Sequence, residues 1–185
     1  MNTQIQYYIN NNINAVAYGP QLAKHWHQRA NLMEAHLGIS LKFLNSASVL
    51  EFGPCGGENA LFLAINGAEV TLVEPNSTMH HPIKELFKGF NLRGLHNNTL
   101  ESFETEQKFD LVIAEGFLLA IPDRKVAFKK IFSFTQGLCI ITYSCMYGNF
   151  YEGLKRYIFS RCLEEDKNLS DDVPSKKLVI ASKCF

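Results

Sequence analysis

The segment SVLEFGPCGGENALFL joins an acidic residue to a cluster of glycines. Glu51 ends an apolar run, and Gly53, Gly56 and Gly57 follow it, before a helix-like segment begins. Glycine is needed where the backbone approaches a ligand closely or adopts a positive φ. An acid just before such a bend would repel a pyrophosphate and attract a cation. The pattern therefore favours a positively charged ligand at the end of a strand.

Two phosphate-binding loops have a similar layout, but neither matches this segment. A dinucleotide site needs G-x-G-x-x-G with apolar residues up to the first glycine. Here the interval between Gly53 and Gly56 does not fit, and Glu51 occupies an apolar position. A P-loop needs Lys followed by Ser or Thr, and the segment has neither. A nicotinamide-dependent dehydrogenase is therefore disfavoured, whereas S-adenosylmethionine, with its amino group and sulfonium, suits Glu51.

The rest of the chain supplies the elements that must position this loop. Apolar runs predict strands at 47–52, 68–75, 92–97, 108–117, 137–144 and 178–182. Helical spacing predicts helices at 20–37, 40–45, 58–66, 76–90 with a break near Pro82, 122–134 and 150–165. This alternation predicts an α/β fold, a Rossmann-like doubly wound and mostly parallel sheet, with ligands beyond the carboxyl ends of its strands.

The ends of several predicted helices carry suitable residues. Pro20 suits the first turn of the first helix, and Gly38 suits its end. Asn76 and Asp123 are suited to the N-caps of two later helices. The first helix has one apolar face, formed by Leu22, Trp26, Ala30, Met33 and Leu37.

Four segments, in this order, resemble class I S-adenosylmethionine-dependent methyltransferases over roughly residues 20–145. VLEFGPCGGENA is similar to the first family motif, E/D-x-G-x-G-x-G, with Glu51, Gly53 and Gly57 in its first, second and last places. VTLVEP ends in Glu74, where the family has an acid that holds both ribose hydroxyls. NNTLESF falls where the family receives the adenine, and FDLVIAEGFLLAIPD resembles the family's fourth strand and its loop.

The resemblance implies a cofactor site for S-adenosylmethionine, with S-adenosylhomocysteine as the product. The implied cofactor-binding residues are Glu51, Gly53, Pro54, Cys55, Gly57, Glu74, Pro75, Asn98, Thr99 and Glu115.

Cys55 departs from the family pattern because it replaces the middle glycine. Cysteine is small, and we expect Gly56 to let the turn relax so that binding survives. Cys55 is disfavoured as a catalytic nucleophile, since no histidine is near it in the sequence and methyl transfer needs no covalent intermediate. A degenerate, non-catalytic domain that binds the cofactor or a protein partner is the alternative.

The sequence does not single out a catalytic residue, because methyl transfer from a sulfonium depends mainly on alignment. Glu115 and Tyr143 are the candidates, since they end the fourth and fifth predicted strands. Each also has a structural interpretation. Glu115 could be a loop acid or lie near the cofactor amino group, and Tyr143 could be a core aromatic.

Four histidines are further candidates for the site. His80 and His81 open a predicted helix, and a solvated helix face is the favoured interpretation. His25 and His27 stand two residues apart on a helix and point to different faces, so no metal site is expected. The side chain of one of them could still point into the ligand pocket from the first helix.

Composition and charge limit which binding partners and which cellular location are expected for the protein. The chain has 185 residues, with 46 % apolar and 19 % charged, which is typical of a globular protein. Lys+Arg and Asp+Glu balance at 18 each, so there is no electrostatic footprint for nucleic acid or an anionic membrane. The five cysteines are scattered, no signal peptide is visible, and no apolar run approaches the about 20 residues of a membrane helix. These features predict a cytoplasmic protein.

We expect residues 1–45 to form an N-terminal arm and helical cap, and residues 46–185 to form a methyltransferase-like domain that lacks its final strand or strands. The family closes its sheet with two strands after the fifth, whereas only 178–182 is strand-like here. A truncated chain would explain this, and a homodimer would cover the open edge. The sequence thus predicts a cytoplasmic methyltransferase that transfers a methyl group from S-adenosylmethionine to a small-molecule acceptor.

Overall fold

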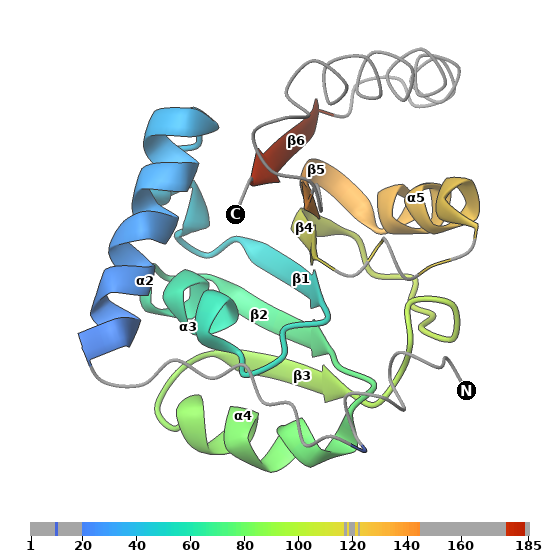
Figure 1. The fold of residues 1–185 in the computed structure, drawn as a ribbon, viewed down its shortest axis with the longest axis horizontal. Helices are drawn as coiled ribbons and strands as arrows, with labels where there is room; N and C mark the ends of the chain where they lie inside the picture. The colour runs from blue at the N-terminus through green and yellow to red at the C-terminus, as the bar shows by residue number, and fades with distance from the viewer. Residues whose placement is uncertain are drawn as a thin grey trace.

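The protein is built around a six-stranded sheet (Figure 1). The computed structural model describes Asn10 and residues 20–116, 118, 121, 123–144 and 177–183. The strand order is β3-β2-β1-β4-β5-β6, and every neighbouring pair is parallel. The strands are β1 (Ser48–Phe52), β2 (Glu69–Val73), β3 (Leu92–His96), β4 (Phe109–Glu115), β5 (Thr135–Ser144) and β6 (Lys177–Lys183).

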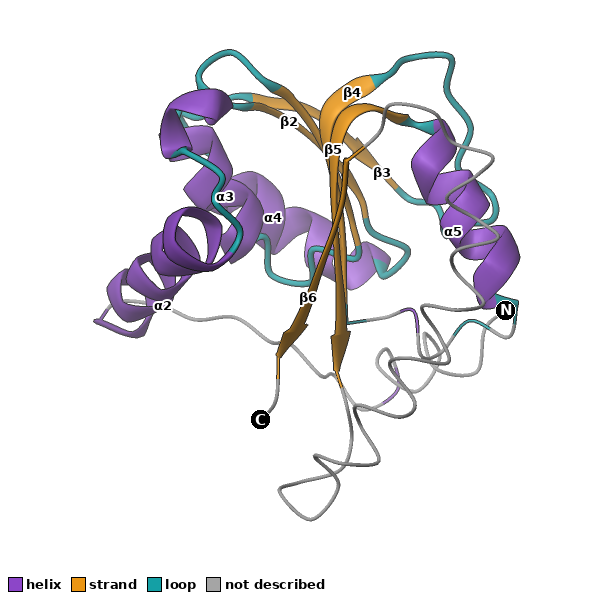
Figure 2. Cartoon of the chain, turned by 90° about the horizontal axis from the view of Figure 1, so that it is seen from above, coloured by secondary structure: helices purple, strands orange, loops and turns teal. Residues whose placement is uncertain are grey.

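Helices cover both faces of the sheet, as Figure 2 shows. One face carries α2 (Pro20–Asn31), α3 (Glu58–Ile65) and α4 (His80–Leu86), and the other carries α5 (Arg124–Ser133). A π-helical turn, Leu32–His36, continues α2, and a 3-10 turn, Leu41–Leu44, leads towards β1. None of the helices in the described ranges combines the length and the apolar character that crossing a membrane requires.

The alternation of side chains along β1 and β4 determines the face of the sheet on which Glu51 and Glu115 lie. Successive side chains of a strand point to opposite faces. Val49 belongs to the core beneath α3 and α4, whereas Phe52 belongs to the core beneath α5. Glu51 therefore lies on the face of Val49. The same alternation in β4 puts Glu115 on the face of Ile113, so both acids point towards the helices α2 and α3.

The fold class predicted from the sequence is confirmed. Trp26, Ala30 and Leu37 pack against the core around the buried Met33, which confirms most of the predicted apolar face of the first helix. Gly38 has a φ of +65° and ends this helical segment.

Two predicted N-caps are also confirmed. The Asn76 side chain accepts a hydrogen bond from the backbone N–H of Thr78, at 3.1 Å, and opens the 3-10 turn Ser77–Met79. The Asp123 carboxylate accepts one from the Val126 N–H, at 3.0 Å, at the start of α5.

The predicted break at Pro82 is wrong. The change of helix type comes earlier, where the 3-10 turn passes into α4 at His80. Pro82 lies in the first turn of α4, where a missing N–H removes no intrahelical hydrogen bond.

The C-terminal part of the chain is described only in β6. The predicted strand at 178–182 corresponds to β6, which pairs with β5 in parallel at the edge of the sheet. The predicted helix at 150–165, the polar loop after it, and the N-terminal arm except Asn10 lie outside the described residues.

A side-chain lock between β1 and β4 fixes the two strands that carry Glu51 and Glu115. One carboxylate oxygen of Asp110 accepts hydrogen bonds from the Ser48 N–H at 2.9 Å and from the Ser48 hydroxyl at 2.7 Å. The Asp110 N–H donates back to the Ser48 hydroxyl oxygen at 3.1 Å. Together with a bond from the Gln136 amide, these contacts hold the pKa of Asp110 below its usual value.

Removing this lock should destabilise the fold. We expect Ser48→Ala to lower the free energy of unfolding by about 1–2 kcal/mol, because it removes two hydrogen bonds, one of them to a charged group. Gln136→Ala is the control, since it removes an exposed hydrogen bond to the same carboxylate and should have a smaller effect. Urea denaturation measures both, and a larger loss in Gln136→Ala would contradict this role of Ser48.

Candidate functional site

The carboxyl ends of β1 and β4 bring Glu51 and Glu115 together. Glu51 pairs with Ile113 across the two strands, so Glu115 stands one alternation further along the same face. In the strand order of this sheet, β1 and β4 flank the point where the connections reverse direction. Ligands of open parallel sheets bind at this point, beyond the carboxyl ends of the strands.

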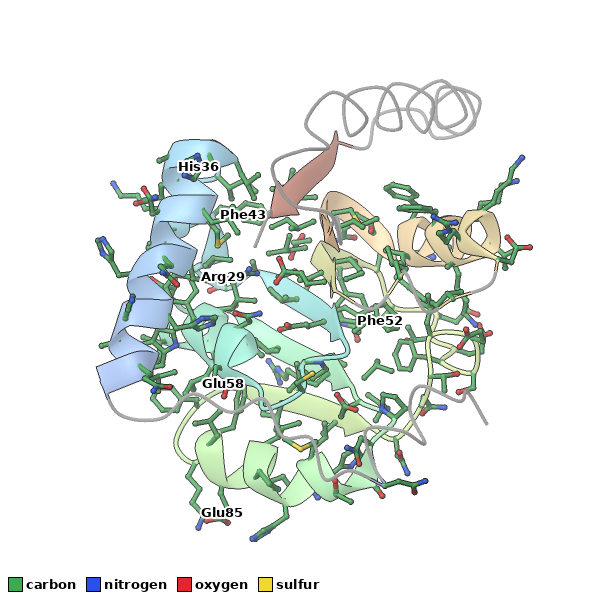
Figure 3. The ribbon with its side chains drawn as sticks, viewed as in Figure 1. Arg29, His36, Phe43, Phe52, Glu58 and Glu85 are labelled. Carbon is green, nitrogen blue, oxygen red and sulfur yellow. The ribbon has the colours of Figure 1, made fainter. Side chains whose placement is uncertain are left out.

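A buried arginine from α2 completes this cluster (Figure 3). Arg29 is 7 % exposed, and its Nη1 lies 2.7 Å and 2.9 Å from the two oxygens of Glu115. The Asn59 amide of α3 donates to Glu115 Oε2 at 3.2 Å, and His25 Nε2 lies 2.6 Å from Asn59 Oδ1. These contacts tie α2, α3 and β4 into one polar network.

Glu51 is the most strongly perturbed acid of the site. It is 2 % exposed, and its Oε2 is buried without a hydrogen-bond partner among the described residues. Burial, reinforced by the negative charge of Glu115, raises its pKa to about 8, and the positive charge of Arg29 opposes this rise. Glu51 is therefore mostly protonated at neutral pH when no ligand cation is bound beside it.

The glycine loop keeps its tight shape despite Cys55. Gly53 and Gly57 have φ values of +66° and +88°, and Cys55 itself has a φ of +51°. The expectation that Gly56 relaxes the turn is wrong, because Cys55 adopts the left-handed conformation instead. Gly56 serves another purpose, since a Cβ there would lie 2.6 Å from a carboxylate oxygen of Glu58.

Glu74 holds this loop from the end of β2. Its Oε2 accepts a hydrogen bond from the Cys55 N–H at 3.1 Å, and its Oε1 accepts one from the Asn76 N–H at 2.8 Å. His80 Nε2 lies 2.8 Å from the Glu74 carbonyl oxygen. Burial raises the pKa of Glu74, and the two backbone hydrogen bonds oppose the rise.

The Cys55 thiol is poorly suited to nucleophilic chemistry. Although Cys55 is an exposed residue, partial desolvation of its thiol and the charges of Glu74, Glu51 and Glu58 raise its pKa to about 11. Since the thiolate is the reactive form, these acids suppress reactivity at neutral pH.

The remaining predicted cofactor residues lie around the same end of the sheet. Pro54 is buried in the glycine loop, and its carbonyl oxygen accepts from the Gly57 N–H at 2.9 Å. Asn98 and Thr99 follow β3 and bond to Ser102, with the Thr99 N–H 3.0 Å from the Ser102 hydroxyl oxygen.

The last two residues predicted for the site are Pro75 and Tyr143. Pro75 is half-buried directly after Glu74. Tyr143 lies in β5, and its side chain is outside the described part of the structure.

Sequence reasoning missed Arg29, Asn59 and Glu58. Arg29 had a visible signal, because it lies between Trp26 and Met33 on the apolar face of the first helix, where a charge needs a buried partner. Glu58, at the first position of α3, is 7 % exposed, and its carbonyl oxygen accepts from the Trp26 indole N–H at 3.2 Å. Asn59 carried no local signal.

A hollow of about 430 Å³ lies elsewhere on the sheet. Its walls include Ser48, Glu69 and Arg93, from the amino-terminal parts of β1, β2 and β3. The acids of the candidate site are not among its lining residues. We therefore place the site by its chemistry, at the carboxyl ends of the strands, rather than by this hollow.

Comparison with protein families identifies the class of this domain. Residues 25–158 match the family model described as "Methyltransferase domain". Because the match spans most of the chain, the protein belongs to the methyltransferase domain family. The predicted family resemblance is confirmed.

Solved structures with a similar fold are also methyltransferases. Magnesium protoporphyrin IX methyltransferase from Synechocystis PCC 6803, solved with bound S-adenosylmethionine, is 15 % identical, with a TM-score of 0.62 over 80 % of this chain and 78 % of that one. The N-methyltransferase NodS from Bradyrhizobium japonicum WM9, solved with S-adenosyl-L-homocysteine, is 14 % identical, with a TM-score of 0.58 over 76 % and 71 %. At these identities the likeness concerns the fold alone. A sequence comparison with curated proteins found no significant match.

The strain at Cys55 predicts a stabilising substitution. Cys55→Gly should raise the free energy of unfolding by about 0.5–1 kcal/mol, because glycine adopts a positive φ without a Cβ collision, partly offset by the greater freedom of glycine in the unfolded chain. Cys55→Ala is the matched control, since it keeps the Cβ and loses only the thiol. If alanine stabilises the protein as much as glycine does in urea denaturation, backbone strain is not the cause.

Glu51 should make the stability of the ligand-free protein depend on pH. Its pKa rises from an unfolded value of 4.5 to about 8 in the fold, so its contribution is complete below pH 4.5 and is lost as pH rises through 8. Glu51→Gln should remove this loss, on the order of 1 kcal/mol per pH unit within the window. Urea denaturation at pH 5, 6.5 and 8, with the exposed Glu106→Gln variant as control, measures it. Parallel pH profiles of Glu51→Gln and the wild type would contradict the burial of an acid at residue 51.

Proposed function

We propose that this protein transfers a methyl group from S-adenosylmethionine to a small-molecule acceptor. The observation that carries the proposal is the buried, unpartnered Oε2 of Glu51, at the end of β1 and directly before the glycine loop. A ligand ammonium satisfies such an oxygen and provides the charge that ionises it. Glu74, which the family resemblance assigns to the ribose hydroxyls, stands at the end of the neighbouring strand β2.

The residues present fit this cofactor. The charges of Glu58, Glu74 and Glu115 create a negative field at Glu51, which favours a ligand with an ammonium and a sulfonium. When bound, S-adenosylmethionine supplies an activated methyl group. The chain supplies binding, alignment and exclusion of water.

Glu115 has a positioning role in this proposal rather than that of a general base. Both of its oxygens contact Arg29 Nη1, and Asn59 donates to one of them, so the carboxylate is already occupied by hydrogen-bond donors. Tyr143, near the carboxyl end of β5, stays a candidate for lining the acceptor pocket. In this proposal the protein promotes the reaction chiefly by aligning the acceptor with the methyl donor, without a general base.

The proposed partners and location follow from charge and cysteine usage. Lys+Arg and Asp+Glu balance at 18 each, which favours a small-molecule acceptor over nucleic acid or a membrane surface. The five scattered cysteines, none of them in a C-x-x-C pair, favour a cytoplasmic location. We also propose that residues 1–45 act as a cap on the domain of residues 46–185. A homodimer through the edge strand β6 belongs to the same proposal.

Binding of S-adenosylhomocysteine tests the proposal directly. We expect isothermal titration calorimetry at pH 7 to show binding with release of nearly one proton, because the pKa of Glu51 is about 8 without ligand. Titrations in two buffers of different ionisation enthalpy measure the released proton. Glu51→Gln should bind more weakly and release none.

5′-Methylthioadenosine is the control ligand, because it keeps the nucleoside and lacks the amino acid group. It should bind to the wild type without proton release. No heat and no thermal stabilisation with millimolar S-adenosylhomocysteine would overturn the proposed function. Binding without proton release would overturn the role of Glu51.

A further inference from the structure

We infer that Arg29 binds the carboxylate of the cofactor's amino acid group, and that Arg29 and Glu51 together form a clamp for this zwitterion. The inference rests on the proposed function and assigns a role to a residue outside the family motifs. Glu115 is then a positioning residue, which holds Arg29 in place.

The unpartnered atoms of Arg29 form one complete binding edge. Nη1 is held by Glu115, whereas Nε and Nη2 are buried and have no hydrogen-bond partner among the described residues. Nε and Nη2 share one edge of the planar guanidinium, and one N–H bond of each points outward in parallel. This edge matches the two oxygens of one carboxylate. Because leaving buried donors unsatisfied is unfavourable, the edge indicates a ligand.

The surrounding charge defines what kind of carboxylate can enter. Glu58, Glu74 and Glu115 each act electrostatically on Glu51, and Arg29 is the cation that opposes them there. A plain anion would meet this excess of negative charge. A zwitterion brings an ammonium as well, so its two ends can satisfy Glu51 Oε2 and the free edge of Arg29 together. In an α-amino acid the ammonium and the carboxylate are attached to the same carbon. This short separation suits Glu51 and Arg29, which interact with each other electrostatically.

The network around Glu115 keeps the edge of Arg29 free. Glu115 contacts only Nη1, at 2.7 and 2.9 Å, and Asn59 and His25 extend the network from Glu115 without a hydrogen bond to Nε or Nη2. Fixing the guanidinium in advance reduces the side-chain freedom that would be lost on binding. This arrangement explains why Glu115 stands at the site although its carboxylate is already paired.

Substitution of Arg29 tests the clamp. Arg29→Lys keeps the charge and removes the bidentate edge, and Arg29→Met removes both. We expect both variants to bind S-adenosylhomocysteine at least tenfold more weakly in calorimetry, with a larger loss for Arg29→Met. Affinity for 5′-methylthioadenosine should be unchanged, because it lacks the carboxylate. Glu115→Gln should lower S-adenosylhomocysteine affinity by a smaller factor and leave 5′-methylthioadenosine unaffected, which a purely structural role would not do.

A ligand-side measurement keeps the inference testable if the variants fail to fold. The wild type should bind the methyl ester of S-adenosylhomocysteine at least tenfold more weakly than the free acid, since the ester has lost the charge that Arg29 recognises. Equal affinity for acid and ester would overturn the inference. Equal losses for S-adenosylhomocysteine and 5′-methylthioadenosine in the Arg29 variants would also overturn it. A wild type that binds none of these ligands would instead refute the proposed function.

Discussion

Burial of several like charges at one end of a sheet is the constraint around which this domain is organised. Glu51, Glu58 and Glu74 are each less than a tenth exposed, and the nearby Arg29 pairs with Glu115 rather than with them. Carboxylates that are crowded and desolvated cannot all ionise. The unfavourable burial of negative charge therefore shows in Glu51, whose pKa rises to about 8. A ligand that carries positive charge would relieve this mismatch, as we propose for the cofactor.

Strands and helices that are distant in the sequence position these buried acids and Arg29. The Ser48–Asp110 lock fixes β1 against β4, and strand alternation then directs Glu51 and Glu115 to the same face. Helix α2 contributes Arg29 and is tied to α3 through the Trp26 indole, so this N-terminal helix is connected to the candidate site. The domain therefore links its N-terminal helix to ligand binding through polar contacts rather than through packing alone.

Much of the fold could be predicted because its signals are local. Unbroken apolar runs, helical spacing and caps such as Asp123 depend on neighbouring residues, and the structure confirms the α/β sheet that they predicted. The role of Arg29 could not be read in this way, because its partner Glu115 is 86 residues away and meets it only after the sheet forms. The conformation of Cys55 was missed for another reason. Its positive φ is imposed by the loop around it, with its N–H held by Glu74, against the preference of the residue itself.

A crystal structure of the protein with S-adenosylhomocysteine would test the central claim most directly, since it places every charged group of the ligand against the chain. The account predicts the ligand ammonium within hydrogen-bonding distance of Glu51 Oε2, and the ligand carboxylate on Nε and Nη2 of Arg29, with Glu115 still on Nη1. An amino acid group that points away from both residues, with their buried atoms still unpartnered, would contradict it.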